Sequence, residues 1–261
     1  MAHANERGLL IEERRRRICE LLRAEGRVTV DSLAARFGTS QVTIRADLAT
    51  LESAGALTRT HGGALSVPDV DQPLNVKQLQ HHPEKLRIAE EAAGLIRDGE
   101  TIVLDSGSTT AQIARRIRTL DLKSINVITN ALNIAALLID VPSVRLIMPG
   151  GILRRESNSL SGPVAETALA TLQANRLYLG ADGIDPQIGV MTPHLAEAQL
   201  NAKMIAISRQ VIVVADSSKF ARRNISLIAR VEQVHMLITD RAAPAEAVEQ
   251  LRQRGVEVRL V

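Results

Sequence analysis

The sequence has few aromatic residues, a single cysteine and no long apolar run. Its 261 residues include no tryptophan, one tyrosine and two phenylalanines, which argues against binding single-stranded nucleic acid by stacking bases on aromatic side chains. Because Cys19 is the only cysteine, no disulfide can form within the chain. We find no apolar run of about 18 residues that could span a membrane and no signal-peptide pattern. We therefore expect a cytoplasmic protein with no membrane partner.

The charges of the chain are nearly balanced. The formal net charge is +3, and residues 1–65 hold ten Arg against eight Asp or Glu, a local balance of +2. Any affinity for DNA must therefore come from the placement of charge, not from its total. The densest basic cluster is Arg14–Arg17. The sequence leaves open whether this run is a solvated helix face or contacts phosphates.

Residues 30–53 have the pattern of two short amphipathic helices separated by a tight turn at Gly38. Glycine takes the positive φ of such a turn at little cost. A longer helix is expected before them, over about residues 11–24, with Leu10 and Ile11 among its apolar positions. This outline is typical of a helix-turn-helix, which presents one helix to the major groove of DNA.

The helix that follows the turn is the expected DNA-reading helix. Val42 and Leu48 are expected on its buried side. Gln and Arg can form paired hydrogen bonds to adenine and guanine edges, and the Thr methyl can meet a thymine methyl. The alternative is an ordinary exposed helix face. The DNA contacts predicted in this helix and at its cap are Ser40, Gln41, Thr43 and Arg45.

A small hairpin is expected after Gly55, where the chain reads ALTRTHGGAL. It would form the wing of a winged helix, with Arg59 and His61 reaching phosphates or the minor groove. A solvent-exposed hairpin edge is the alternative.

This N-terminal segment resembles the DNA-binding domain of the DeoR family of bacterial sugar-operon regulators. Ala46 departs from the family pattern, in which a second arginine usually follows the first, so Arg45 is expected to carry more of the DNA contact. The matching core is Thr43-Ile44-Arg45, Asp47-Leu48, Leu51, Gly55 and Arg59 through Ala64.

Residues 67–83 contain three prolines, an adjacent histidine pair and no hydrophobic period. They predict a linker between a DNA-binding domain, residues 1–66, and a second domain, residues 84–261. The histidine pair has no cysteine or carboxylate at a metal-site spacing, so we expect no metal. We expect no cofactor either.

From residue 84 onward, short apolar runs alternate with helical patterns. This alternation indicates an α/β domain with a largely parallel sheet, in which ligands bind beyond the carboxyl ends of the strands. The expected strands are residues 101–104, 126–129, 145–148, 177–179, 211–215 and 235–239.

The segment LDSGSTTAQIA has the pattern of a strand, a turn of small residues and a helix. Its amides and hydroxyls would meet at a helix N-terminus, where the helix dipole favours an anion. No Gly-Lys-Ser/Thr follows, so a nucleoside triphosphate is not expected. The alternative is a well-capped turn without a ligand.

Other strand ends offer further polar groups to the same edge of the sheet. Thr129 and Asn130 end one strand, and Gly150, Gly151 and Arg154 follow another, where the arginine can pair with an anion. Four charged side chains lie at later strand–loop boundaries, namely Asp182, Glu197, Asp216 and Lys219.

This half of the chain resembles the sensor domain of the DeoR family, which is similar to ribose-5-phosphate isomerase and glucosamine-6-phosphate deaminase. The resemblance implies that DSGSTT is a sugar-phosphate loop and that Glu197 lies near the position of the isomerase base. The corresponding stretch IGVMTPHLAE lacks the isomerase's glycine run and lysine, so no catalytic residue is assigned. The predicted effector-binding residues are Asp105, Ser106, Gly107, Ser108, Thr109, Thr110, Thr129, Asn130, Gly150, Gly151, Arg154, Asp182, Gly183, Glu197 and Lys219.

The segments TPHLAEAQLNAKMI and VADSSKF resemble the amino-sugar branch of that family, the repressors of N-acetylgalactosamine or galactosamine catabolism. We therefore expect a transcriptional repressor, not an enzyme, that binds double-stranded operator DNA as a homodimer or homotetramer. A phosphorylated sugar would control it. The alternative is a sugar-phosphate isomerase or deaminase with an accessory DNA-binding domain. The sequence does not separate repression from activation.

Overall fold

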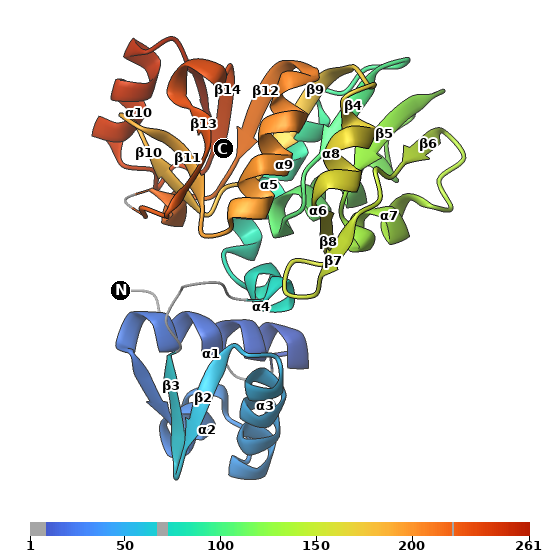
Figure 1. The fold of residues 1–261 in the computed structure, drawn as a ribbon. Coiled ribbons are helices and arrows are strands. Elements are labelled where there is room, and N and C mark those ends of the chain that lie inside the picture. Colours follow the sequence, from blue (N-terminus) through green and yellow to red (C-terminus); the bar gives the residue numbers. More distant parts are fainter. Residues whose placement is uncertain (1–8, 67–72, 221) are drawn as a thin grey trace. The chain divides into compact units, whose positions relative to one another are not determined.

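The computed structural model describes residues 9–66, 73–220 and 222–261. The chain divides into two compact units, Met1–Gln80 and His81–Val261, which are described separately (Figure 1). In the described parts, no helix combines the length and apolarity that a membrane crossing requires.

The N-terminal unit is a winged helix-turn-helix, as predicted. Its three strands form an antiparallel sheet in the order β1-β3-β2. Thr29 caps α2 through a reciprocal pair of hydrogen bonds with Ser32, and Gly38 ends this helix in the left-handed conformation, with φ 62°. The elements are α1 (Ile11–Glu25), β1 (Arg27–Thr29), α2 (Val30–Phe37), α3 (Gln41–Ser53), β2 (Leu57–Thr60), β3 (Gly63–Ser66) and α4 (Leu74–Leu79).

The core of this unit corrects three sequence expectations. Leu10 and Ile11 are exposed, because the inward stripe of α1 begins only at Ile18. Val42 is 72% exposed. It lies two residues before the buried Ile44, and two residues on a helix point to nearly opposite sides.

The segment expected to be a linker is partly helical. Residues 67–72 lie outside the described residues. Beyond them α4 inserts Val76 into the core of the N-terminal unit, and the next helix already begins at His82. The helix α4 has only six residues, too few to show a hydrophobic period in the sequence.

The C-terminal unit is built on a seven-stranded parallel sheet in the order β15-β14-β12-β9-β4-β5-β6. This confirms the predicted α/β fold class. Helices α5 (His82–Ala93), α6 (Ser108–Ile117) and α7 (Leu132–Leu138) contribute to one core cluster, and α8 (Pro163–Leu169), α9 (Leu195–Ala206) and α10 (Ala245–Gln253) to the other. The strands are β4 (Thr101–Leu104), β5 (Ile125–Thr129), β6 (Val144–Ile147), β9 (Ala174–Leu179), β12 (Ser208–Val214), β14 (Met236–Thr239) and β15 (Glu257–Leu260).

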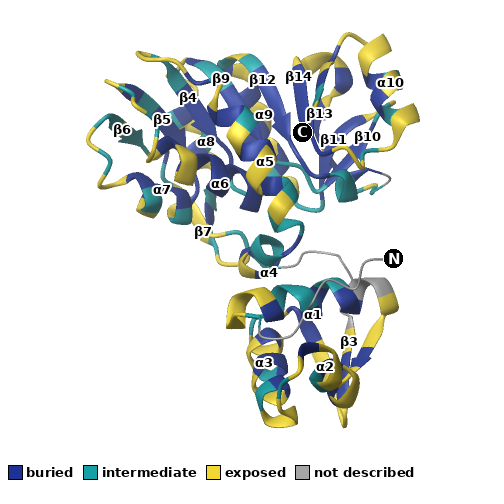
Figure 2. Ribbon diagram, turned by 180° about the vertical axis from the view of Figure 1, so that it is seen from behind, coloured by how far each residue is buried: buried dark blue, intermediate teal, exposed yellow. Residues whose placement is uncertain are grey.

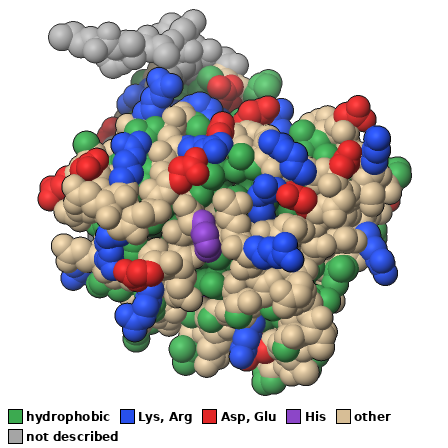
Figure 3. Space-filling model, turned by 90° about the horizontal axis from the view of Figure 1, so that it is seen from above, with side chains coloured by type: hydrophobic (Ala, Val, Ile, Leu, Met, Phe, Trp, Pro, Cys, Tyr) green, Lys and Arg blue, Asp and Glu red, His purple; other side chains and the backbone are tan. Residues whose placement is uncertain are grey.

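Both faces of the parallel sheet are buried, as Figure 2 shows. On β9, Tyr178 packs into one cluster while Leu177 and Leu179 pack into the other. This explains why the strands appear in the sequence as continuous apolar runs. Charged side chains of both signs are interspersed over the face shown in Figure 3.

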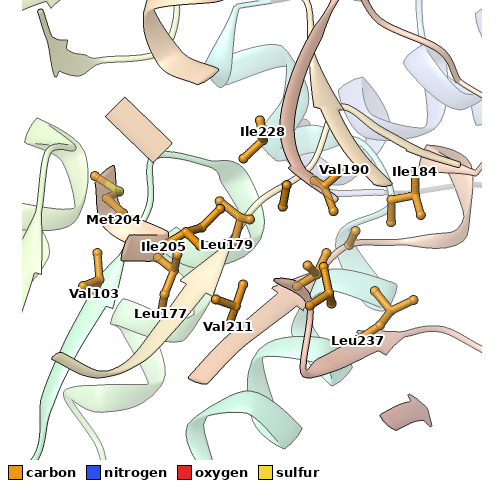
Figure 4. Close-up of a cluster of buried hydrophobic side chains, with 14 of the residues drawn as sticks. Val103, Leu177, Leu179, Ile184, Val190, Met204, Ile205, Val211, Ile228 and Leu237 are labelled. Carbon is orange, nitrogen blue, oxygen red and sulfur yellow. The ribbon is translucent and has the colours of Figure 1, made fainter. Parts of the chain in front are cut away.

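Sequence reasoning did not find two smaller antiparallel assemblies. A hairpin pairs β7 (Ile152–Arg154) with β8 (Ser159–Ser161), and a second sheet has the order β10-β11-β13. Side chains of this second sheet pack into the core beside β9, β12 and β14 (Figure 4). Its strands are only three to five residues long, and the third lies far along the chain from the first two: β10 (Gly183–Asp185), β11 (Gly189–Thr192) and β13 (Ser226–Arg230).

The strand order reverses between β4 and β9. From β4 the chain builds outward to β5 and β6, then returns to place β9 on the other side of β4 and continues through β12, β14 and β15. Ligands of open α/β sheets bind in the crevice at such a reversal, beyond the carboxyl ends of the strands. A ligand site is therefore expected at this edge of the sheet.

Candidate functional site

The start of α3 brings the predicted DNA contacts together on an exposed surface. Gln41 donates to Asp31 Oδ1 at 2.6 Å and accepts from the Arg45 guanidinium at 2.9 Å. Gln41 and Arg45 are exposed, and Thr43 is partly exposed. The hydroxyl of Ser40 accepts from the Thr43 amide at 3.1 Å, which makes it a helix cap. Side chains so placed can reach base edges in a major groove.

The wing presents Arg59 and His61 to solvent. The amide of Arg59 donates to Glu52 Oε1 at 2.9 Å, so α3 and the wing are tied together. At Gly63 a side chain would overlap the carbonyl oxygen of Val28, so glycine lets β3 pack closely against β1. The predicted wing residues are therefore held on a fixed hairpin beside α3.

The basic run on α1 is paired within its own unit. Arg14 and Arg15 both bind Asp47 of α3, while Arg16 lies 3.8 Å and Arg17 2.6 Å from Glu20. The run is therefore not a row of unpaired cations that faces solvent.

In the C-terminal unit, Asp105 lies at the reversal of strand order. It follows β4, is 3% exposed, and accepts hydrogen bonds from the Ser106 amide at 2.7 Å and the Gly180 amide at 3.2 Å. Gly180 follows β9, so the two strand ends on either side of the reversal meet at this carboxyl group. Burial, with smaller increases from the charges of Glu197 and Asp182, raises the pKa of Asp105 to about 8, although the hydrogen bonds from the Ser106 and Gly180 amides lower it. At pH 7 the group is protonated and can donate a hydrogen bond.

Helix α6 begins directly beside Asp105. Its N-cap is Gly107, and no side chain of the described residues caps the helix. Ser108 and Thr109 in the first turn are buried, and Thr110 donates its hydroxyl to the Gly107 carbonyl at 3.1 Å. Backbone amides at the start of a helix, with small hydroxyl side chains around them, favour an anion.

A polar network joins three more elements near Asp105. Arg154 of β7 donates to Glu197 of α9 at 3.1 Å and lies 2.8 Å from His194 Nε2. Thr192 of β11 donates to Asp182 Oδ2 at 3.2 Å. Because Glu197 and Asp182 both raise the pKa of Asp105, the three carboxyl groups lie within electrostatic reach of one another.

Sequence reasoning missed His194 and Thr192 as members of this network. Thr192 belongs to one of the short antiparallel strands that the sequence did not predict. A lone histidine in a loop gives no signal by itself, and His194 becomes a candidate only through its contact with Arg154.

The other predicted effector residues lie at the same edge of the sheet or beside it, with structural roles of their own. Asn130 donates to the Leu160 carbonyl at 3.0 Å, and the Thr129 hydroxyl accepts from the Ala131 amide at 3.2 Å. Glycine is required for packing at two positions, because a side chain would overlap the Ser161 carbonyl oxygen at Gly151 and the Arg222 carbonyl oxygen at Gly183. Beside Gly150, a Cβ would meet only Val164 at 3.8 Å.

Lys219 is part of a charged cluster after β12. Burial would raise the pKa of Asp216, but the positive charges of Lys85, Lys219 and His81 outweigh it and lower that pKa. Lys85 is 2% exposed and comes from α5, which is why the sequence pattern at strand ends did not reveal it. Lys219 thus interacts with a buried carboxylate at this edge of the sheet. In the described parts of the chain, no three His, Cys, Asp or Glu side chains gather to hold a metal ion.

Comparisons with known proteins match the two units of the chain to two different family models. Residues 14–69 match the model of the DeoR-like helix-turn-helix domain, and residues 80–241 match that of the DeoR C terminal sensor domain. A protein of Escherichia coli O157:H7, named as a candidate repressor of the aga operon, is 42% identical over 95% of this chain and 93% of its own length. The transcriptional repressor AccR of Agrobacterium fabrum is 36% identical over 88% of this chain and 89% of its own.

A solved ribose 5-phosphate isomerase from Methanocaldococcus jannaschii matches 52% of this chain and 53% of its own, with a TM-score of 0.38 and 21% identity. A likeness at that level assigns neither an activity nor a ligand. The two curated relatives named above are regulators, which favours a regulator over an enzyme with an accessory domain.

Proposed function

The chain belongs to the DeoR family of transcriptional regulators, and from this we propose that it represses a carbohydrate catabolic operon under the control of a phosphorylated sugar. The aga operon in the name of the E. coli relative is consistent with the resemblance to the amino-sugar branch. We therefore assign a phosphorylated amino sugar as the effector. Double-stranded operator DNA is the partner of the N-terminal unit, and no cofactor is assigned.

One observation carries the effector proposal: the uncapped start of α6 lies at the reversal of strand order, beside a carboxyl group that is protonated at pH 7. The helix start would hold the phosphate of the sugar. A neutral Asp105 does not repel a phosphate, as an ionised carboxylate would. Asp182 and Glu197 would face the rest of the sugar, where an amino group is the favourable counterpart of carboxylates.

The two units must be coupled for the sugar to regulate DNA binding. The sugar has to bind the arrangement that releases DNA better than the arrangement that binds it, or no equilibrium shifts. A useful response needs a difference of about 1–3 kcal/mol. We also propose a homodimer or homotetramer, because one winged helix buries too little surface for a selective interface.

The proposal is tested by fluorescence anisotropy with labelled duplexes from the region upstream of the protein's own gene. The titrations use hexose and amino-hexose phosphates, with the unphosphorylated sugars as controls, at two salt concentrations because phosphate contacts make the affinity depend on salt. We expect a phosphorylated amino sugar to release the duplex while its unphosphorylated form does not. If no phosphorylated sugar in the panel changes the affinity, the effector proposal is wrong. A monomeric mass by light scattering, at concentrations that bind the duplex, would contradict the oligomer.

A further inference from the structure

The reading helix α3 carries a buried carboxylate that binds two arginines of α1. Asp47 is 2% exposed. Its Oδ2 lies 2.6 Å from Arg14 Nε, and its Oδ1 lies 3.0 Å from Arg15 Nε. The two cations come from consecutive residues, and each takes a different oxygen, so both carboxylate oxygens are engaged.

Further hydrogen bonds fix the two guanidinium groups. Arg14 Nη1 donates to the Leu9 carbonyl at 3.2 Å, and Arg15 Nη2 donates to the Thr50 hydroxyl of α3 at 3.2 Å. Helix α3 therefore cannot rotate about its axis or slide along α1 without losing one of these bonds. Because Gln41 and Arg45 belong to the same helix, its rotation decides where they point.

A buried ion pair is a costly way to join two helices. Removing charges from water can cost more than their attraction returns, and apolar side chains of similar size often stabilise a protein as well or better. The best-attested advantage of such a pair is that it fixes the register of two elements. Asp47 lies among the apolar residues Ile44, Leu48 and Leu51 on the inward side of α3. Apolar contacts are non-directional and do not by themselves fix the rotation of a helix.

We propose that Asp47 is a positioning residue for DNA recognition: it sets the rotation of α3 and holds Arg14 and Arg15 away from DNA phosphates. The inference rests on the proposed binding of operator DNA. It assigns to Asp47 a role in discriminating the operator from other sequences, beyond the stability of the fold. It also answers the question left open for the basic run, since two of its arginines serve the reading helix and not the phosphates.

The test uses the full-length protein and two duplexes: one selected by the wild-type protein from a randomised pool, and a scrambled version of it. In Asp47→Asn, Arg15 loses its buried charged partner and keeps only the exposed Glu12, at 3.3 Å, while α3 loses its fixed rotation. We expect the ratio of selected to scrambled affinity to fall at least about tenfold, as when one specific base contact is lost. Binding of the scrambled duplex should strengthen, with a salt slope steeper by about 0.9 for one new phosphate contact.

The matched control is Glu13→Gln, which removes the same charge from the exposed side of α1, where Glu13 lies 3.7 Å from Arg16. Its ratio should stay within about twofold of wild type, since it makes no base contact. A purely structural role of Asp47 would lower both affinities together and leave the ratio unchanged. That result for Asp47→Asn would overturn the proposal.

Arg15→Gln keeps the buried pair of Arg14 and Asp47, so it tests the positioning role even if Asp47→Asn fails to fold. We expect the ratio of selected to scrambled affinity to fall about threefold or more, while the affinity for the scrambled duplex and its salt slope stay at wild-type values. A weaker scrambled affinity with a slope shallower by about 0.9 and an unchanged ratio would make Arg15 a phosphate contact, which contradicts the proposal. If the wild-type protein selects no sequence from the pool, the proposed function fails, and not this inference alone.

Discussion

The two units of the chain hold their candidate functional groups in opposite ways. In the N-terminal unit, Gln41 and Arg45 lie one helical turn apart on an exposed surface. In the C-terminal unit, Asp105, Arg154 and Glu197 come from distant parts of the chain and meet at a largely buried edge of the sheet. A surface that reads a large partner can be built from one helix. A pocket that encloses a small ligand has to be assembled from several elements.

Two buried carboxyl groups, Asp47 in the N-terminal unit and Asp105 in the C-terminal unit, also have different surroundings. Asp47 has an arginine on each carboxylate oxygen, whereas Asp105 accepts from the Ser106 and Gly180 amides and has two other carboxylates nearby. Asp47 is therefore a fixed support for two arginines, whereas burial and nearby like charges raise the pKa of Asp105.

The largest expected effect comes from removing the carboxyl group of Asp105. Asp105→Ala deletes the acceptor of the Ser106 and Gly180 amides at the proposed ligand site. We expect the free energy of unfolding to fall by about 2–3 kcal/mol, because two hydrogen bonds of about 1 kcal/mol each are lost and their amides are left without partners. The affinity for the effector should fall as well, because the Ser106 and Gly180 amides are no longer held in place at the proposed site. Operator binding without effector should be unchanged. Calorimetric titration of the sugar phosphate measures the affinity for the effector, and anisotropy measures operator binding without effector. Normal release of DNA by the effector would remove Asp105 from the site.

The reciprocal change is Arg45→Ala in the N-terminal unit. One paired hydrogen-bond contact to a base is worth about 1–3 kcal/mol of discrimination, and Ala46 offers no second arginine beside it. We expect discrimination between operator and random DNA to fall by that amount, while the effector binds as before. Competition titrations with random DNA measure it. Unchanged discrimination would show that other side chains read the operator.

A third prediction uses the raised pKa of Asp105. Below about pH 8 the carboxyl group is protonated, and above it the ionised group repels a phosphate. We expect the affinity for the effector to fall up to about tenfold between pH 7 and pH 9, equivalent to about one pKa unit. Asp105→Asn resembles the protonated acid, so it should bind like wild type at pH 7 and lose the pH dependence. The same fall in the Asn variant would show that the titrating group is not Asp105.

The same ionisation has a consequence for stability. Asp105 keeps its proton in the folded protein up to about pH 8, whereas the unfolded chain releases it near its ordinary pKa of 3.8. Its contribution to folding is therefore complete below about pH 4 and is lost as the pH rises toward 8. Thermal unfolding in the absence of ligand should show a smaller decrease over this range in Asp105→Asn than in the wild type.

The smallest expected effect is that of Arg59→Ala on the wing. Arg59 lies 3.7 Å from Glu52 and is exposed, so it can contact a phosphate. We expect affinity to fall to a similar degree for operator and random DNA, and the salt slope to become shallower by about 0.9. A loss confined to the operator would instead make Arg59 a base contact in the minor groove.

The local features of the chain were predictable, and the contacts between distant segments were not. Gly38 predicts the turn, and Ser40 predicts the cap of the reading helix, because both act on neighbouring residues. Val42 was placed wrongly, since the inward stripe of α3 depends on which face meets α1. His194 and Thr192 entered the candidate site only through their contacts with Arg154 and Asp182.

The sequence by itself determined the two-part organisation, the winged helix, the parallel α/β class and the strand ends where polar groups lie, because these follow from periodicity and from residues that act within a few positions. Only the tertiary structure decided the strand order, with its reversal between β4 and β9. It likewise decided the burial that protonates Asp105 and the pairing of Arg14 and Arg15 with Asp47. The electrostatic environment of a charged side chain depends on what surrounds it in space, and those neighbours come from elements far along the chain.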